Sequence, residues 1–349
     1  MRDDRVEAKW VDAFRQIFDL SEVRRGDEVA ILSETQSRQL NVQLAEIALQ
    51  QMGAQAFHVV VPTPRISAPV PVRSTGSSNA IQMSRSVIGA LATSDMVIDI
   101  TVEGLLHSRE LPEIIKPGKT RVLFISNEHP EILERLMPTP ELRNRVLRGL
   151  DMLRKAKTMR VTSEAGTDVT VHVAGAPSGG AKGIAARAGE VDHIPPGLIA
   201  CFPGANAING TIVLDRGDMN LTFKRIQESQ VRLVIEDDYV RRIEGEGVDA
   251  EMMRDYYAAW GDPKAFATSH IGWGMNKDAR WEALAMYDRF QHNGVEQRVF
   301  AGNVLYSTGS NEYAQRFTLC HFDLPMRNCT VALDGETVVE RGRLVGELA

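Results

Sequence analysis

The chain lacks the features that would assign it to a membrane or to an oxidising compartment. No apolar window approaches the roughly 18 residues that a membrane span requires, and the first ten residues are charged and contain neither an apolar core nor a cleavage site. Its three cysteines, Cys201, Cys320 and Cys329, have spacings that fit neither a disulfide framework nor a CxxC zinc site. We therefore expect a cytoplasmic protein without membrane association, whose cysteines are reduced and mostly buried.

The sequence also lacks a surplus of positive charge. Its 40 Lys and Arg residues are outnumbered by 46 Asp and Glu residues, and no basic run is long enough to neutralise a phosphate backbone. Nucleic acid is therefore not an expected partner. With 43% hydrophobic and 25% charged residues in 349 positions, the composition is that of a globular protein, and the length favours two domains or one large α/β unit.

Several familiar catalytic motifs are absent as well. The chain has no Walker loop, no G-x-S-x-G elbow, no H-E-x-x-H pair and no G-x-G-x-x-G that opens a helix after a strand. The glycine-rich segment GAPSGGAKG (175–183) lies between β-segments rather than at a helix N-terminus. We interpret it as a mobile loop over a site rather than as a phosphate cradle.

The first 150 residues alternate between two patterns. Helical periodicity covers 5–18, 40–53 and 80–94, and short apolar runs of strand length cover 27–34, 56–62, 96–100 and 122–126. Apolar strands separated by helices indicate a mostly parallel sheet that is covered on both faces. We therefore predict an N-terminal α/β domain over residues 1–150, with a Pro- and Ser-rich loop at 62–78.

The rest of the chain, residues 151–349, has a different period. After a helical connector over 129–156, apolar and polar residues alternate over 158–175, 210–215, 231–247 and 329–345. Alternation of this kind, with tight turns between the segments, indicates antiparallel strands. One helix, over 249–260, interrupts them. We predict a C-terminal β-rich α+β domain that carries the functional site.

Three residues of this second part form a candidate metal site. His270 lies beside two glycines and a tryptophan in TSHIGWGMN, and His321 and Asp323 are two residues apart in LCHFDLPMRNC. Residues i and i+2 of a strand project from one face, so His321 and Asp323 can reach a common point. H-x-D on a strand with a distant histidine is the ligand set of mononuclear non-haem iron(II) sites. The same pattern arises by chance, and a histidine in a β-rich core is often only a hydrogen-bonded structural residue, so spacing alone leaves both interpretations open.

Around these residues the sequence resembles the 2,5-dihydroxypyridine 5,6-dioxygenases, the ring-opening enzymes of bacterial nicotinate catabolism. The resemblance extends over most of the chain and is densest in SHIGWG (269–274), YDR (287–289), GNVLYSTGSN (302–311) and CHFDLPMRNC (320–329). It implies that His270, His321 and Asp323 are the iron ligands. It further implies that His107 and His193 lie on the substrate side of the metal and Ser307 near the bound ring. One of these two histidines would be the general acid/base.

The wider scaffold is similar to the aminopeptidase T-type metallopeptidases, which supply the alternative function of a metal-dependent hydrolase. Those enzymes hold two metal ions through an H-x-H-x-D motif, a glutamate and a further histidine. The corresponding positions here are Leu319, His270 and Leu305, so two ligands of the second metal are leucine and the bridging carboxylate is histidine. A two-metal hydrolase needs ligands that hold its ions about 3.5–4 Å apart. We therefore expect one metal ion and no peptidase activity.

The resemblance thus predicts an aminopeptidase T-like fold and an Fe(2+)-dependent dioxygenase without an organic cofactor. Its substrates would be O2 and a small dihydroxylated N-heteroaromatic, most directly 2,5-dihydroxypyridine, which would be opened to N-formylmaleamate. Relatives with this scaffold tend to be oligomers, so we expect a homo-oligomer.

The sequence departs from the resembled enzymes in the predicted substrate pocket. Where those enzymes carry a glutamate that meets the substrate, this chain has Ala181 or Lys182, and two flanking tryptophans are replaced by Val191 and Ile194. These changes leave the iron chemistry in place and make the ring substituents an open question. Lys182 or Arg187 would suit a carboxylate on the ring.

Overall fold

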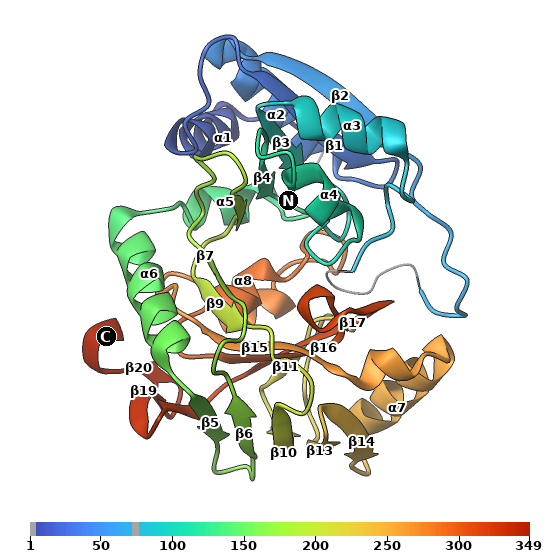
Figure 1. Cartoon of the computed structure of the whole chain (residues 1–349), viewed down its shortest axis with the longest axis vertical. Helices are drawn as coiled ribbons and strands as arrows, with labels where there is room; N and C mark the ends of the chain where they lie inside the picture. Colours follow the sequence, from blue (N-terminus) through green and yellow to red (C-terminus); the bar gives the residue numbers. More distant parts are fainter. Residues whose placement is uncertain (1–4, 72–76) are drawn as a thin grey trace.

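The computed structural model describes residues 5–71 and 77–349, which form two stacked parts (Figure 1). Residues 72–76 of the predicted loop lie outside the described residues. The elements of the first part alternate as predicted: α1 (Ala8–Leu20), β1 (Glu28–Glu34), α2 (Gln39–Met52), β2 (Gln55–Val61), α3 (Arg85–Thr93), β3 (Met96–Asp99), α4 (Glu110–Ile115), β4 (Arg121–Phe124) and α5 (Pro130–Arg135). The short helix α4 is the one element of this list that the sequence patterns did not predict.

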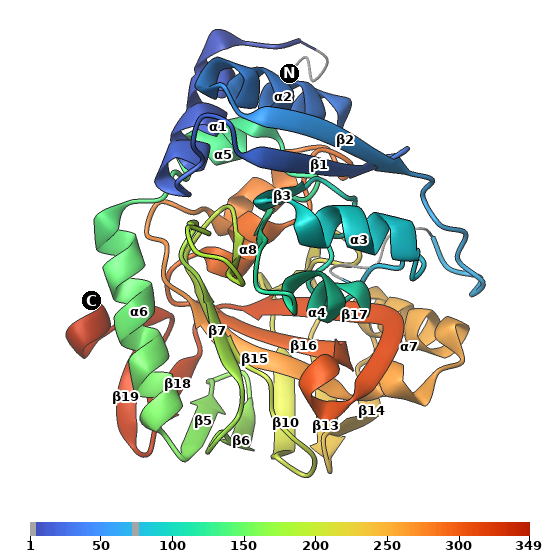
Figure 2. The same ribbon diagram turned by 45° about the horizontal axis from the view of Figure 1, so that its top comes forward.

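The first part is built on a sheet in the order β2-β1-β3-β4-β8, which we call the parallel sheet. Its neighbouring strands are parallel throughout, which confirms the predicted architecture. The strands β3 and β4 are buried along their whole length, because helices cover both faces (Figure 2). Helix α2 ends where the sequence predicts, since Gly53 adopts the left-handed conformation of a helix C-cap (φ 76°).

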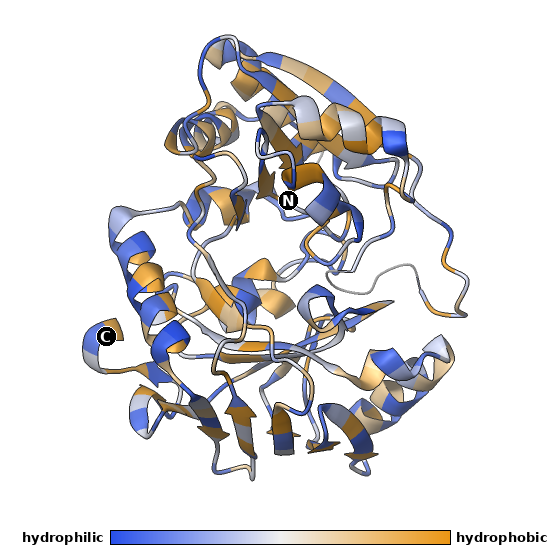
Figure 3. Cartoon of the chain, in the orientation of Figure 1, coloured by the Kyte–Doolittle hydropathy of each residue, from blue (hydrophilic) through white to orange (hydrophobic). Residues whose placement is uncertain are grey.

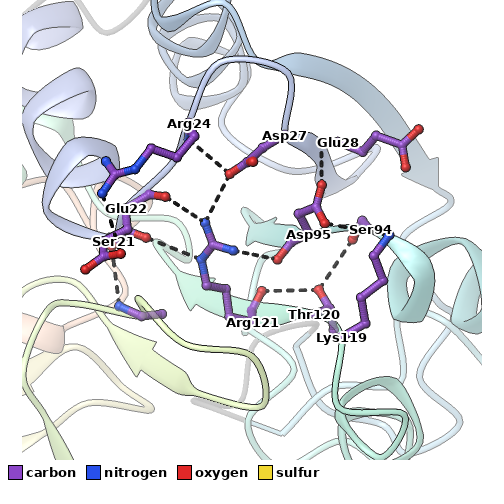
Figure 4. A network of polar contacts seen from close by, with 11 residues as sticks. Ser21, Glu22, Arg24, Asp27, Glu28, Ser94, Asp95, Lys119, Thr120 and Arg121 are labelled. Carbon is purple, nitrogen blue, oxygen red and sulfur yellow. Dashed lines mark hydrogen bonds and ion pairs between the residues drawn. The ribbon is translucent and has the colours of Figure 1, made fainter.

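One buried arginine connects the amino end of β4 in the parallel sheet to the loops around it (Figure 4). Arg121, the first residue of β4, donates hydrogen bonds to the backbone carbonyls of Ser21, Glu22 and Asp95 at 3.3, 3.2 and 2.9 Å. Its Nη2 atom also lies 3.4 Å from Asp27 Oδ2. The single side chain thereby connects the end of α1, the start of β1 and the start of β3.

Helix α6 (Pro140–Lys155) is the connector, and it runs down one side of the molecule (Figure 1). The Thr139 hydroxyl accepts a hydrogen bond from the Leu142 N–H group, and Pro140 occupies the first turn, as is typical of helix N-termini. The predicted boundary at residue 150 falls inside this helix. We keep the two-domain division as a proposal, with β8 (Val191–His193) as a strand that returns from the second part to pair with β4.

The second part contains mainly antiparallel strands, as predicted. Its elements are β5 (Thr158–Thr162), β6 (Asp168–His172), β7 (Ser178–Ala181), β9 (Leu198–Cys201), β10 (Ile208–Leu214), β11 (Met219–Asn220), β12 (Arg225–Ile226), β13 (Val231–Glu236), β14 (Tyr239–Glu244), α7 (Val248–Trp260), β15 (Thr268–Gly274), α8 (Val295–Val299), β16 (Val304–Asn311), β17 (Arg316–Met326), β18 (Thr330–Leu333), β19 (Glu336–Glu340) and β20 (Arg343–Leu344). Short 3₁₀ turns lie at Pro263–Phe266, Trp281–Ala285, Glu312–Ala314 and Gly346–Leu348.

These strands form two large antiparallel sheets, and β11 pairs with β12 in a separate two-stranded sheet. The outer sheet has the order β14-β13-β10-β6-β5-β18-β19-β20, and the second, which we call the site sheet, has the order β17-β16-β15-β9-β7. Their facing sides share one apolar core that includes Trp273, Tyr257 and Phe322. The hydropathy colouring shows the resulting alternation along the outer strands (Figure 3).

The glycine-rich segment differs from its prediction as a mobile loop. Residues 178–181 form the edge strand β7, which pairs with β9. Glycine fits here because a Cβ atom on Gly180 would lie only 2.9 Å from the Val146 side chain of α6. Residues 178–181 are therefore a packed edge strand of the site sheet, and their small side chains allow close contact with helix α6.

Two further expectations can be checked in the described residues. All three cysteines are free and buried, as predicted. No helix in the described ranges is both long enough and apolar enough to span a membrane.

Candidate metal centre

Three neighbouring strands of the site sheet supply the predicted residues. His270 lies on β15, Ser307 on β16, and His321 and Asp323 on β17. The ladder between β16 and β17 places Ser307 opposite Asp323. The register between β15 and β16 shifts between Thr268 and Ile271, so His270 lies in an irregularity that redirects its side chain.

The predicted metal ligands converge on one carboxylate oxygen. Asp323 Oδ1 lies 3.2 Å from His321 Nε2 and 3.7 Å from His270 Nε2. The Ser307 hydroxyl donates a hydrogen bond to the same oxygen. The strand spacing therefore brings His321 and Asp323 to one point as expected, and the bulge brings His270 to them. Their role as metal ligands remains a prediction.

His107 joins this cluster from the first part of the molecule. It lies in the segment between β3 and α4, and its ring centroid is 4.5 Å from that of His321 and 5.5 Å from that of His270. Ligand atoms of these three histidines lie within 4.8 Å of one another. His107 Nδ1 is 3.3 Å from Glu312 Oε2, so a carboxylate of the second part orients this imidazole.

Electrostatic interactions and burial keep Asp323 ionised and keep His270 and His321 neutral. Burial acts to raise the pKa of the Asp323 carboxyl, but the Arg298 guanidinium and the His321 ring hold that pKa well below its usual range. Burial lowers the pKa of His321, and it lowers the pKa of His270 well below the usual value. Metal binding requires neutral imidazole and ionised carboxylate ligands, and these are the favoured forms here.

The donor set fits a divalent transition metal ion. Imidazole nitrogens suit iron and zinc, and a single carboxylate with two histidines is the set found in non-haem iron(II) oxygenases. The two Nε2 atoms and Oδ1 are buried and face one another, and His270 Nδ1 has no hydrogen-bond partner among the described residues. His107 adds a third imidazole, so the cluster offers a 2-His-1-carboxylate set and an overlapping 3-His set.

The cluster forms one wall of a cavity of about 230 Å³ between the two parts of the molecule. The remaining walls include the small residues of β7, the loop after β3, and the aromatic rings of Phe202 and Tyr313, whose centroids are 5.0 Å apart. A cavity this small, largely apolar with a few polar groups, suits a single-ring ligand.

His193 also lines this cavity, and its ring stacks on Phe124 at 4.6 Å. Burial lowers the pKa of His193 to about 3. The neighbouring Asp192 does not orient an imidazole with its side chain. Its Oδ1 atom accepts the backbone N–H groups of Lys182, Gly183 and His193 at 2.8–2.9 Å.

Lys182 is not available to a ring carboxylate in this structure. Its ammonium group lies 3.3 Å from Asp192 Oδ2, and Lys182 is not among the cavity-lining residues, whereas Ala181 is. The acidic residues Glu103 and Glu312 line the cavity instead. Arg187 is exposed and is likewise not part of the lining. The expectation that one of these cations faces the ring is therefore wrong.

Sequence reasoning missed several residues of the site. Arg298, on α8, donates from Nε to Asp323 Oδ2 at 2.7 Å. Glu312 pairs with His107, and Phe202 lies against His270 with a centroid separation of 5.4 Å. Arg298 and Glu312 have no local motif, because each acts on a residue from another element.

The chain has an aminopeptidase T-like fold. The structure of AmpT from Thermus thermophilus has a TM-score of 0.63 and 12% sequence identity, and the match covers 97% of this chain and 99% of that chain. At this identity the likeness concerns the fold alone, and it confirms the predicted scaffold.

Within that fold class, the sequence comparison is more specific. The profile of the 2,5-dihydroxypyridine 5,6-dioxygenase (NicX) family matches residues 9–346. The 2,5-dihydroxypyridine 5,6-dioxygenase of Pseudomonas putida is 34% identical over 344 residues, 97% of this chain and 96% of that protein. The solved structure of 2,5-dihydroxypyridine dioxygenase from Pseudomonas putida has a TM-score of 0.91 and covers 99% of both chains. The chain belongs to the 2,5-dihydroxypyridine 5,6-dioxygenase family.

Proposed function

We propose that this protein is a mononuclear iron(II) dioxygenase that opens the ring of 2,5-dihydroxypyridine to N-formylmaleamate. One observation carries the proposal: in a chain of this family, two imidazole Nε2 atoms and one carboxylate oxygen converge on the wall of a ring-sized cavity. The reaction adds both atoms of O2 to the substrate, and the product retains every atom of the ring. His270, His321 and Asp323 would hold the iron(II), which would supply the redox chemistry that activates O2 toward the ring.

The side chains around the cluster would prepare the substrate for this chemistry. The His107–Glu312 pair suits the acid/base role, because the carboxylate fixes Nδ1 and leaves the other ring nitrogen to exchange a proton with the substrate. His193 suits a positioning role instead, since a group with a pKa of about 3 is a poor proton donor near neutral pH. Phe202 and Tyr313 would cover the ring and exclude water.

The cavity charge favours a ring without a carboxylate. Glu103 and Glu312 line the cavity. The one arginine of its lining, Arg298, is paired with Asp323, and the lysine nearest to it is paired with Asp192. A carboxylated ring would place a second anion beside these acids without a new cation to offset it. We therefore propose uncharged dihydroxylated N-heteroaromatics as the substrate class.

Oxygen uptake by the reconstituted protein tests this function. The chain is loaded anaerobically with iron(II) and mixed with 2,5-dihydroxypyridine, with its carboxylated analogue in parallel. We expect one O2 consumed per ring opened, loss of the aromatic ultraviolet band, and much slower turnover of the carboxylated analogue. Iron-loaded protein that consumes no O2 with either ring would contradict the proposal.

The hydrolase alternative is tested on the same preparation. Release of amino acids from short peptides, after loading with Co(II) or Zn(II), would support it. We expect none, because the positions of two second-metal ligands are Leu305 and Leu319. We also propose a homo-oligomer, which light scattering of the purified protein measures directly.

A further inference from the structure

The two oxygens of Asp323 face different partners. Oδ1 lies beside the imidazoles of His321 and His270, at 3.2 and 3.7 Å from their Nε2 atoms. Oδ2 points to the other side and accepts a hydrogen bond from Arg298 Nε at 2.7 Å. Both Asp323 and Arg298 are buried, with 2% and 8% of their surfaces exposed. One oxygen of the carboxylate is therefore already committed to a guanidinium group.

Arg298 is itself held in place. Its Nη1 atom donates to Asn293 Oδ1 at 3.1 Å and lies 3.4 Å from the Asn293 carbonyl oxygen. The guanidinium thus bridges Asp323 and Asn293 through two different nitrogens. A planar fork with donors on both sides can hold a carboxylate in one orientation, which a single ammonium point charge cannot do equally well.

The helix that carries Arg298 is fastened to the first part of the molecule. Helix α8 is only five residues long, too short to hold its position without tertiary contacts. The Val295 N–H group donates to Glu128 Oε1 at 2.7 Å, and Arg135 donates to both Glu296 oxygens at 2.7 and 2.9 Å. Glu128 and Arg135 both belong to the first part, so α8 is anchored to both parts of the molecule.

We propose that Arg298 is a positioning residue that restricts Asp323 to metal binding through Oδ1 alone. The inference rests on the proposed metal site. A carboxylate that binds through one oxygen occupies one coordination position, whereas a carboxylate that binds through both oxygens occupies two. By holding Oδ2, Arg298 would keep one more position open for the ring and O2. The role is distinct from catalysis, because the guanidinium of Arg298 donates its hydrogen bonds to Asp323 and Asn293.

Cobalt(II) binding to the apoprotein tests the inference independently of turnover. Dissociation constants of wild type, Arg298→Met and Arg298→Lys are measured by anaerobic competition with a chelator, and the visible spectrum of each Co(II) complex is recorded. We expect Arg298→Met to bind about 10–100-fold more weakly, the range typical of a lost partner behind a ligand. Its Co(II) bands should weaken as the freed Oδ2 raises the coordination number. Arg298→Lys should recover part of both effects.

The alternative, a purely electrostatic role, predicts the opposite sign. A guanidinium repels a divalent cation, so removing the charge alone would tighten Co(II) binding in Arg298→Met and leave Arg298→Lys like wild type. Tighter or unchanged binding would overturn the inference. A change in the KM for the ring alone in Arg298→Met would also overturn the inference, because Arg298 would then contact the substrate.

Arg135→Met is the matched control. It removes an arginine that bonds to the same short helix but does not reach Asp323. We expect it to lower the thermal stability and to leave the Co(II) constant within about threefold of wild type. If Arg298→Met does not fold, Arg298→Lys carries the test. A wild-type protein that binds no Co(II) or iron(II) would refute the metal site itself, whereas normal binding by wild type and Arg298→Met alike would refute only the inference.

Discussion

The parallel sheet and the site sheet place their polar side chains in different ways. In β3 and β4 of the parallel sheet, apolar residues are buried on both faces, and the buried carboxylate Asp99 lies at the carboxyl end of its strand. In β17 of the site sheet, His321 and Asp323 lie in the middle of the strand and are equally buried. In β3 the buried polar group therefore lies at the strand end, whereas β17 carries its polar groups within a ladder.

The difference has an energetic consequence. A buried charge within a strand is tolerated only if side chains of other elements form hydrogen bonds or ion pairs with it. Asp323 has such partners in Ser307 and Arg298. The loops of the parallel sheet then contribute His107, which is held by Glu312 from the other part. The site is complete only where the two kinds of sheet meet.

The largest expected effect on iron binding and turnover comes from a change in the site sheet. Asp323→Asn keeps the shape of the side chain but removes the charge that we propose for the metal. We expect loss of bound iron and a fall in the rate of O2 uptake of more than about 100-fold. This loss exceeds the 10–100-fold loss of metal affinity or activity that is usual when a residue hydrogen-bonded to a ligand is changed. His107→Ala should retain one iron per chain and lose turnover. Iron content by elemental analysis and oxygen-electrode rates measure both variants.

A buried aspartate elsewhere in the second part provides the control. Asp238 accepts the backbone N–H groups of Asn206, Ala207 and Ile208 at 2.7–3.0 Å, away from the cluster. Asp238→Asn should therefore keep the iron. If His107→Ala loses the metal and Asp323→Asn retains it, the ligands are the three imidazoles instead.

Sequence patterns predicted the first region well for a physical reason. Strands that are buried on both faces must be apolar throughout, so β1, β3 and β4 can be read from short apolar runs. The glycine C-cap at Gly53 is an equally local signal. The mispredicted segment, 175–183, has no large apolar side chain to show that β7 packs against α6.

The site was only partly predictable. The H-x-D spacing of His321 and Asp323 is a local property of one strand, and it gave their proximity directly. The sequence made His270 a candidate, but the bulge that brings it to the other two residues has no local signal. His107 required a contact between the two parts, so only the resemblance to a family suggested it. Arg298 and Glu312 act on residues 25 and 205 positions away, respectively, and no local pattern can indicate such pairs.

A change in the parallel sheet should lower the stability of the protein and leave its iron binding and turnover unchanged. Arg121→Met removes the donor shared by three backbone carbonyls (Figure 4). Because those carbonyls and Asp27 lose a buried partner, we expect unfolding to become easier by about 3–5 kcal/mol. The iron content and the rate per folded molecule should stay unchanged. Urea unfolding and oxygen uptake measure the two properties.

The matched control is Arg160→Met in the outer sheet. Arg160 also pairs with a carboxylate through two bonds of 3.1 Å, to Asp168, but both side chains are more than half exposed. We expect a cost below about 1 kcal/mol. Equal costs for the two variants would show that burial of the Arg121 network contributes nothing to stability.

The smallest expected effect lies at the junction of the two sheets. Asp192 is on β8 of the parallel sheet, and Lys182, its ion-pair partner at 3.3 Å, directly follows β7 of the site sheet. Burial raises the pKa of Asp192 to about 6, against the opposing effect of Lys182. Between about pH 4 and pH 6 the unfolded chain therefore ionises this group while the folded chain keeps the proton.

The sign of the pH dependence follows from this difference. The folded state binds the extra proton, so the contribution of Asp192 to stability is present below about pH 4 and is lost as the pH rises through about 6. Asp192→Asn keeps an oxygen that can accept the three backbone N–H groups but cannot ionise. The stability of wild type relative to this variant should therefore fall by about 2 kcal/mol across that interval, as measured by urea unfolding at several pH values. A constant difference would mean that Asp192 is ionised in the folded protein throughout and that the Lys182 pair outweighs its burial.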